Sequence, residues 1–250
     1  ALPGTPDLAV IAAPPATTPG IIAALGAAGT KVAVLVGRWG GPWDALMPKV
    51  LEAARPSLLR VIGPGSFGVA VPALGLNASF SPATAGPGRL ALVSQSGAIA
   101  STLTEWAAER GIGFSHVVSL GSMADVDLGD YLDLLAGDRA TTGILLYLQS
   151  VKAPRKFMSA ARSAARLKPV VAIKGGRYGA GVLAARLHTG ALAGSGVVAD
   201  AALRRAGVLR VEGLSELFAA AEIMGRFRPL RRGRLAIATN AGAAGVLAVD

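Results

Sequence analysis

Short apolar runs alternate with alanine-rich amphipathic segments along most of the chain. In the first 63 residues, buried strands are predicted at 7–13, 31–36 and 58–63, and helices at 18–28 and 43–54. Consecutive strands separated by helices need crossover connections, and such connections are typical of parallel sheets. The first region therefore predicts a three-stranded parallel unit.

A second series begins at Arg89, after a Gly/Pro-rich connection at 63–88. Strands are predicted at 89–94, 114–120, 141–148, 169–174 and 208–211. Helices are predicted at 96–110, 127–135, 154–167, 197–206 and 214–225. This pattern predicts a complete doubly wound α/β unit.

A third unit begins with a predicted strand at 234–240 and a predicted helix at 241–250. One strand and one helix cannot bury a core. The chain also starts without Met. We therefore expect both ends to have been cut from a longer polypeptide.

Composition narrows the classes of protein. Apolar residues make up 52% and charged residues 16%, which excludes a disordered chain. The chain has no Cys and two His, so we expect no disulfide scaffold and no metal site. Two long uncharged stretches, 8–30 and 61–88, are broken by Pro, Gly and polar residues, so we expect no membrane span. The absence of Cys fits a reducing, cytoplasmic location.

The net charge of +10 is uneven. Five Arg residues fall within 226–234 around Pro229 and Gly233. This favours a linker over a nucleic-acid patch, because a single aromatic residue, Phe227, stands among them and aromatic residues are 5% of the chain. Residues 139–199 carry ten Lys or Arg and no Asp or Glu. This stretch is either a solvated basic face or a positive field that attracts anionic substrates.

Two loops carry candidate chemistry. In VSQSGA, 93–98, a predicted strand turns directly into a helix, so backbone N–H groups and the hydroxyls of Ser94 and Ser96 are available to an anion. The alternative is a plain Ser N-cap. The second loop, 185–196, holds His188 among Gly and Ala residues. An imidazole there is a structural residue or a phosphoryl-accepting nucleophile, whereas His116, within a strand, is interpreted as structural.

Five segments together resemble the α-type region of the nucleoside-diphosphate-forming acyl-CoA synthetases, relatives of succinyl-CoA synthetase. They are VSQSGA (93–98), SLGSMADVD (119–127), 144–177, HTGALAGS (188–195) and 200–218. The resemblance covers nearly all of residues 7–250. It implies an α/β fold with a partial Rossmann-like CoA-binding domain at 1–88 and a flavodoxin-like, doubly wound parallel domain at 89–225. Residues 226–250 would be a linker and the truncated start of a second ligase domain.

The resemblance also implies an acid–CoA ligase reaction. Acyl-CoA and phosphate give acyl phosphate and CoA, the acyl phosphate phosphorylates His188, and the phosphohistidine passes its phosphoryl group to ADP. CoA or acyl-CoA and phosphate would bind to this region. ATP, ADP and Mg²⁺ would bind to an ATP-grasp β-type module, in cis or in trans, which this chain lacks. The chain alone is therefore expected to be inactive, and its apolar composition leaves a homo-oligomer open.

Carried over residue by residue, the resemblance places His188 and Gln149 in catalysis. The residues implied for phosphate are Ser94, Gln95, Ser96, Gly97, Ala98, Thr189 and Gly190. The residues implied for CoA are Ala13, Pro14, Val36, Gly37, Gly65 and Ser66.

The sequence departs from the family pattern at two points. The family has a Glu where this chain has Gln149, and that Glu accepts the Nδ1 proton of the catalytic His. An amide oxygen still accepts the hydrogen bond but brings no charge, and an Asp-to-Asn change behind a catalytic His costs about 10⁴-fold elsewhere. Gly65 and Ser66 stand where the family usually has an Asn after Gly-Pro, which changes the contacts expected with CoA.

A second interpretation belongs to a different class of protein. The segments 156–166 and 228–237 resemble regions fused to bacterial protein lysine acetyltransferases, which sense acyl-CoA without ligating it. The presence of His188 favours the ligase, and Gln149 favours the sensor.

Overall fold

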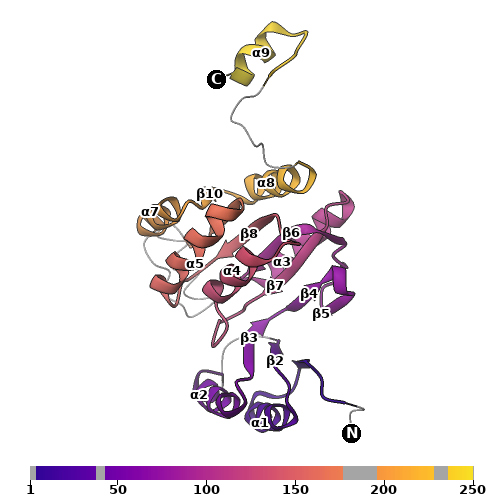
Figure 1. Ribbon diagram of the computed structural model, residues 1–250, viewed down its shortest axis with the longest axis vertical. Coiled ribbons are helices and arrows are strands. Elements are labelled where there is room, and N and C mark those ends of the chain that lie inside the picture. Colours follow the sequence, from indigo (N-terminus) through magenta and orange to yellow (C-terminus); the bar gives the residue numbers. More distant parts are fainter. Residues whose placement is uncertain (1–3, 38–42, 177–195, 228–235, 250) are drawn as a thin grey trace.

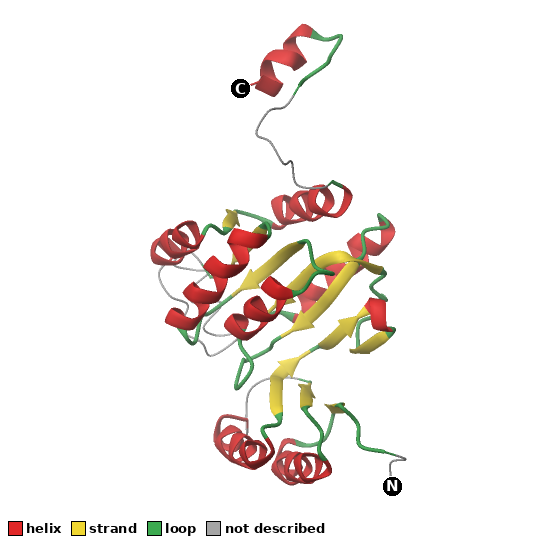
Figure 2. Ribbon diagram, viewed as in Figure 1, coloured by secondary structure: helices red, strands yellow, loops and turns green. Residues whose placement is uncertain are grey.

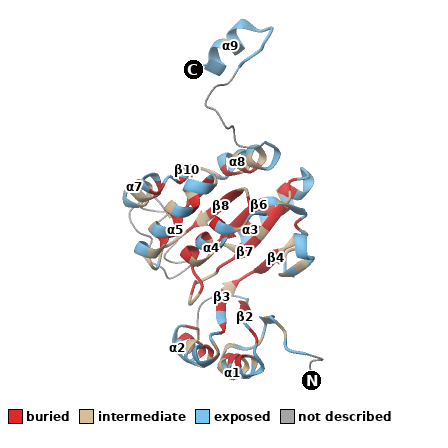
Figure 3. Cartoon of the chain, in the orientation of Figure 1, coloured by how far each residue is buried: buried red, intermediate tan, exposed pale blue. Residues whose placement is uncertain are grey.

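A computed structural model describes residues 4–37, 43–176, 196–227 and 236–249 of the chain. The described chain is an α/β structure with two sheets, as the hydrophobic pattern predicts (Figure 1). Helices pack against both sheets, and the buried residues lie between these layers (Figures 2 and 3).

The smaller sheet is parallel, in the order β1 (Leu8–Ile11), β2 (Val32–Val36) and β3 (Arg60–Ser66). Two helices, α1 (Thr18–Ala28) and α2 (Trp43–Ala54), connect these strands. Because the strands are added in one direction, crossovers of one hand place both helices on the same face. Ile22, Leu35, Val50 and Val61 are fully buried in the core between helices and sheet.

The larger sheet has seven strands. Its order is β10 (Leu209–Val211), β9 (Val170–Lys174), β8 (Gly143–Leu148), β6 (Pro87–Ser94), β7 (Phe114–Ser119), β4 (Gly68–Val71) and β5 (Leu76–Ser79). The five strands from β6 to β10 are parallel, and their order, counted along the chain, is 2-1-3-4-5. This is the flavodoxin-like order, whose switch point lies between β6 and β8.

Helices cover both faces of the larger sheet. On one face lie α3 (Gly97–Glu109) and α8 (Leu214–Arg226), packed on Leu90 and Leu92 of β6. On the other lie α4 (Leu128–Gly137), α5 (Pro154–Leu167) and α7 (Gly196–Ala206), packed on Ala91 and Val93. Successive side chains of a strand point to opposite faces, so one apolar strand supplies both cores.

The two sheets share a core. Val34 and Ile62 of the smaller sheet belong to the same buried cluster as Val118 of β7 and Leu132 of α4. The part of the smaller sheet that α1 and α2 leave uncovered is thereby packed against the larger unit.

Two predictions of the sequence reasoning are wrong. The connection at 63–88 contains an antiparallel hairpin, β4 and β5, with the short 3₁₀ helix η3 (Pro72–Leu74) between its strands. β4 also pairs antiparallel with β7, so the hairpin extends the larger sheet. Its four-residue strands are too short to show a clear alternation of apolar and polar residues. Two further 3₁₀ turns, η1 (Pro15–Thr17) and η2 (Arg55–Ser57), flank helices of the first unit.

The second wrong prediction is the strand at 234–240. Residues 236–240 are described and contain no strand, whereas the predicted helix that follows is present as α9 (Gly242–Val249). A strand needs a neighbouring strand for its backbone hydrogen bonds, and no described residue supplies one here. No residue of α9 is buried. Within the described ranges, no helix is both long and apolar enough to span a bilayer.

Candidate functional site at the switch point of the larger sheet

The candidate site lies where β6 and β8 end side by side. Ser94 at the end of β6 pairs with Tyr147 near the end of β8. The chain leaves β6 toward α3 on one face and leaves β8 toward α5 on the other. In open α/β sheets this divergence opens the crevice in which ligands bind.

The Gln95 side chain ties the two diverging loops together. Its Oε1 accepts the backbone N–H groups of Gln149, at 2.6 Å, and Ser150, at 3.1 Å. Its Nε2 donates to the Ser150 hydroxyl at 3.3 Å. Gln95 is 8% exposed, so it is a buried connection between the loops, and its amide is used there rather than left free for a ligand.

The first turn of α3 leaves backbone donors unpaired. Ser96 is the N-cap, and its hydroxyl accepts the N–H of Ile99 at 3.4 Å. The N–H groups of Gly97 and Ala98 precede the first intrahelical bond and find no acceptor among the described residues. The helix dipole adds partial positive charge at the same place. These two N–H groups and the Ser96 O–H are the donors the structure offers to an anion.

Ser94 has a different role from the one expected. It is fully buried, and its hydroxyl donates to the Ser96 carbonyl at 2.7 Å while accepting the Ser96 N–H at 3.0 Å. The hydroxyl hydrogen of Ser94 is thus used inside the loop. Ser94 shapes the turn into α3 and does not offer the free donor that the sequence reasoning expected.

A cavity of about 330 Å³ joins the two predicted binding regions. It is lined by Gly37, Gly65 and Ser66, which the sequence predicts as CoA-binding residues, and by Gly97 and Ala98 at the start of α3. The remaining described lining residues are Phe67, Phe80, Pro82 and Ser101. Residues predicted from separate parts of the sequence therefore meet in one cavity.

The other expected CoA residues lie near this cavity but do not line it. Ala13 and Pro14 follow the carboxyl end of β1, and Ala13 packs against the core beneath α1 and α2. Val36 ends β2 and pairs with Ser66. Gly37, the next residue, donates its N–H to the Ser66 carbonyl at 3.3 Å, so Val36 orients a residue that does line the cavity.

Sequence reasoning missed the cavity wall formed by Phe67, Phe80 and Pro82. Phe67 lies between β3 and β4, and Phe80 follows β5, so the unpredicted hairpin carries the wall. Phe67 packs closely on α3: a Cβ added to Gly97 would lie 2.8 Å from the Phe67 Cβ. The available signal was the pair Phe67 and Phe80, the two aromatic residues of the connection at 63–88.

The turn that carries Gly65 and Ser66 is held by backbone bonds to the segment 119–126. That segment donates N–H groups to the turn and its strand, Ser122 to Pro64, Ala124 to Gly63 and Val126 to Val61. Gly121 has φ +57°, and a Cβ there would lie 2.2 Å from the Pro64 carbonyl oxygen. SLGSMADVD (119–127) therefore forms the support of the turn.

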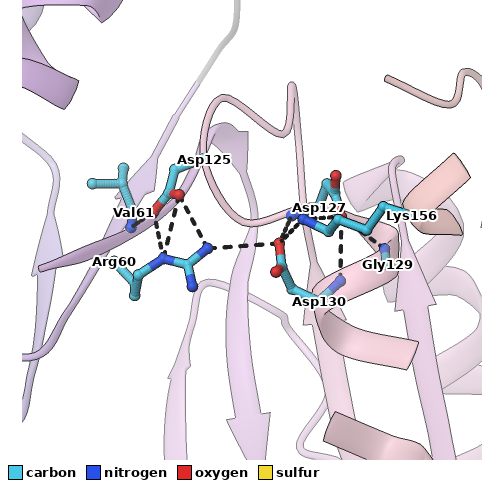
Figure 4. Close-up of polar contacts among 7 residues, drawn as sticks. All are labelled: Arg60, Val61, Asp125, Asp127, Gly129, Asp130 and Lys156. Carbon is cyan, nitrogen blue, oxygen red and sulfur yellow. Dashed lines mark hydrogen bonds and ion pairs between the residues drawn. The ribbon is translucent and has the colours of Figure 1, made fainter. Parts of the chain in front are cut away.

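A chain of charged residues fastens the same junction (Figure 4). Asp125 accepts the Val61 N–H at 2.8 Å and Arg60 Nε at 3.0 Å. Arg60 also reaches Asp130 of α4 at 3.6 Å, and Lys156 of α5 donates to Asp130 at 2.7 Å. The network connects β3 to both helices.

The charges of this network shift one another's pKa values. The hydrogen bond with Asp125 is the largest influence on Arg60 and raises its pKa, against partial burial. Burial acts most strongly on Asp130 and would raise its pKa, but the contacts with Lys156, the Asp127 N–H and Arg60 together lower it. The carboxylates therefore favour the charged form of Arg60, and Lys156 and Arg60 favour the charged form of Asp130.

Gln149 follows β8 and is half-buried. Its backbone is fixed by Gln95, while no described residue hydrogen-bonds to its side-chain amide. His188, Thr189 and Gly190 lie outside the described residues, so their placement in the site stays a prediction.

His116 lies on β7, with Nδ1 3.7 Å from Asp138 Oδ2, and burial is the main cause of its lowered pKa.

Lys174 is a buried cation at the carboxyl edge that sequence reasoning did not single out. It ends β9, pairs with Leu148 in the sheet and is 5% exposed. Its Nζ donates to the Gly175 carbonyl at 2.5 Å, and burial lowers its pKa.

Arg155, Arg162 and Arg166 share one face of α5, as their spacing predicts. Part of the basic stretch thus lies on a solvated helix face.

Fold and site define the class of protein. It is a doubly wound α/β protein in which the N-terminus of a helix at the switch point faces a cavity shared with a second, Rossmann-like sheet. Residues 87–224 match the family model described as the succinyl-CoA ligase like flavodoxin domain, and residues 1–72 match the one described as a CoA binding domain. The chain belongs to the succinyl-CoA ligase-like flavodoxin domain family.

Two ligases are similar in sequence to this chain over its whole length. The acetate–CoA ligase [ADP-forming] I subunit alpha of Pyrococcus furiosus is 38% identical over 253 residues, which cover 100% of this chain and 55% of that protein. The acetate–CoA ligase [ADP-forming] I of Archaeoglobus fulgidus is also 38% identical, over 100% of this chain and 37% of that protein.

A solved structure shows the same fold. The dinucleotide-forming acetyl-coenzyme A synthetase 1 of Ca. Korarchaeum cryptofilum, in complex with phosphate and ADP, superposes with a TM-score of 0.90 at 33% identity. The match covers 98% of this chain and 54% of that one. The chain thus spans about half, or less, of the length of the relatives it matches.

Proposed function

We propose that this chain is the α-type region of an NDP-forming acid–CoA ligase, which makes acyl-CoA through an acyl phosphate and a phosphohistidine at His188. The observation that carries the proposal is the shared cavity. Gly37, Gly65 and Ser66 of the CoA-type region line it with Gly97 and Ala98 of the helix N-terminus. A thioester and a phosphate bound to these two regions would meet in one space.

The chemistry divides into three transfers, written here toward ATP. A phosphate oxygen attacks the thioester carbonyl of acyl-CoA, the C–S bond breaks, and CoA leaves as the thiol after taking a proton. His188 Nε2 then attacks phosphorus, and the P–O bond to the acyl oxygen breaks to release the carboxylate. A phosphate oxygen of ADP finally attacks the phosphohistidine, which regenerates the imidazole. Running in reverse, the sequence makes acyl-CoA from acid, CoA and ATP.

The start of α3 suits the charge that these steps develop. Phosphate, acyl phosphate and phosphohistidine are all anionic, and unpaired N–H groups at a helix N-terminus stabilise anions. The donors are Gly97 N–H, Ala98 N–H and the Ser96 hydroxyl, while Ser94 and Gln95 hold the loop in shape. We assign Thr189 and Gly190 to the same phosphate on the family resemblance alone.

The relatives support this activity and its partner. The two ligases named above are described as ADP-forming, and the solved structure holds phosphate and ADP. Since this chain spans about half of their length or less, we propose that an ATP-grasp module, in cis or in trans, binds ADP or ATP with Mg²⁺. Neither named ligase is described as an acetyltransferase, so the sensor interpretation rests on Gln149 and on the resemblance of the segments 156–166 and 228–237 to acetyltransferase-fused regions.

The test is acid-dependent turnover by the complete polypeptide that carries this chain, with an ATP-grasp partner supplied where that is a separate subunit. Acetate, CoA and Mg-ATP should give acetyl-CoA, ADP and phosphate in equal amounts. His188→Ala should abolish turnover, and His116→Gln, which changes the other histidine of the sequence, should retain it. A folded wild-type protein that binds CoA without forming acetyl-CoA would support the sensor instead.

A further inference from the structure

We propose that Phe80 determines which acids the site accepts, because its ring forms the wall against which the carbon chain of the acyl group packs. The substrate class that follows is monocarboxylic acids without a second charge. This inference rests on the proposed ligase function and deepens it.

Phe80 is exposed and yet held in place. The residue is 61% exposed, although it is large and apolar. Its backbone N–H donates to the Phe67 carbonyl at 3.2 Å, and its ring meets the Phe67 ring edge to face, with centroids 5.5 Å apart and planes at 69°. Phe67 is itself 5% exposed. The buried ring therefore fixes the exposed ring at the cavity.

The aromatic pair stands directly beside the proposed phosphate donors. Phe67 packs on Gly97, the first residue of α3, and both rings line the same cavity as Gly97 and Ala98. In an acyl phosphate, a single bridging oxygen separates the phosphorus from the acyl carbon. When the phosphoryl group of an acyl phosphate is bound at the N-terminus of α3, its acyl chain therefore begins inside this cavity. Phe80 and Pro82 form an apolar part of the cavity wall there.

The cavity suits a small uncharged chain better than the alternatives. At about 330 Å³ it lies at the low end of the range for drug-sized ligands, about 300–1,000 Å³, and is too small for a whole CoA molecule. Among its described lining residues none is charged, and the Ser66 hydroxyl is already bonded to the Ser119 carbonyl. A second carboxylate at the end of the acyl chain would lose hydration without finding a charged partner among these described residues.

The experiment compares acids at saturating CoA with the complete polypeptide and its ATP-grasp partner. The values of kcat/KM for acetate, butyrate, hexanoate and succinate are measured for wild type, Phe80→Ala and Phe80→Trp, and the KM for CoA is measured in a second series at a fixed concentration of each acid. Leu74→Ala is the matched control, since Leu74 is an exposed apolar residue, 79% exposed, of the same hairpin segment and does not line the cavity. Circular dichroism confirms folding of each variant.

We expect Phe80→Ala to raise the hexanoate-to-acetate ratio of kcat/KM about tenfold, and Phe80→Trp to lower it by a similar factor. Leu74→Ala should leave the ratio unchanged, and succinate should be the poorest acid for the wild type. A ratio that moves by less than about twofold in a folded Phe80 variant would overturn the inference. A uniform rise in the KM for CoA with every acid would do the same, because it places Phe80 against the pantetheine arm. A wild type that uses no acid would instead overturn the ligase function itself.

Discussion

The side-chain oxygen of Gln95 accepts the backbone N–H of Gln149 at 2.6 Å. The two residues follow β6 and β8, the strands on either side of the switch point. One buried amide thereby fixes the distance between the loop that starts α3 and the residue proposed to orient His188. The proposed phosphate site and the residue proposed to orient His188 are held to each other by this bond.

Gln95→Ala should destabilise the chain by about 1–3 kcal/mol, because it leaves the N–H groups of Gln149 and Ser150 without their acceptor. Gln149→Ala is the matched control and should change the free energy of unfolding by less than about 0.5 kcal/mol, since only its backbone takes part in the contact. Urea unfolding of both variants measures the difference. Equal destabilisation by the two substitutions would show that the hydrogen bonds of the Gln95 side chain do not contribute to the free energy of unfolding.

Gln149→Glu tests the departure from the family pattern. A carboxylate in place of the amide would hold the proton on Nδ1 of His188 and stabilise the charged phosphoryl adduct. We expect the initial rate of His188 phosphorylation to rise at least about tenfold, a small part of the roughly 10⁴-fold effect of a comparable carboxylate-to-amide change. Rapid-quench labelling with [γ-³²P]ATP measures the rate, and an unchanged or lower rate would contradict this role of position 149.

Asp125 should matter more to stability than its ion partner Arg60. Asp125→Ala removes the acceptor of the Val61 N–H and should cost about 1–3 kcal/mol. Arg60→Ala breaks an ion pair whose Arg side chain is 48% exposed and should cost about 0–1 kcal/mol. Thermal unfolding at low and high salt separates the two, because only the ion pair is screened. A larger effect of Arg60→Ala would reverse this interpretation.

His116 should make stability depend on pH in the range where the imidazole titrates. Burial lowers its pKa below the ordinary value of 6.5, with Asp138 opposing and Lys168 adding to the shift. The fold therefore favours the neutral ring: this contribution is complete above pH 6.5 and is lost as the pH falls through the lowered pKa. The free energy of unfolding of His116→Gln should fall less than that of wild type as the pH drops below about 6.5. Parallel curves would contradict the shift.

Most of the fold could be predicted from the sequence because its strands are buried on both faces. Apolar runs such as 89–94 and 144–148 have few alternative structures, and α1, α2 and α5 begin and end at the predicted residues. The hairpin β4–β5 was not predicted because its strands have four residues each and make antiparallel pairs at the edge of a parallel sheet. Its pairing with β7 is set by tertiary contacts that no local pattern reveals.

The candidate site was predictable only in part. The turn from strand to helix at Ser96 and Gly97 has a local signature, and the structure places a capped helix there. The roles of Ser94 and Gln95 as internal supports, and of Phe80 as cavity wall, depend on contacts between distant segments. Sequence spacing cannot distinguish a hydroxyl that faces a ligand from one that bonds its own loop.

Phosphoryl transfer to His188 is the central claim, and labelling tests it most directly. The complete polypeptide, with its ATP-grasp partner, is incubated with [γ-³²P]ATP and Mg²⁺, and the position of the label is read after proteolysis. The account predicts base-stable, acid-labile label on the peptide that contains His188, lost in His188→Ala and released by acetate as acetyl phosphate. A folded, nucleotide-binding protein that takes up no label, or the same label in His188→Ala, would contradict it.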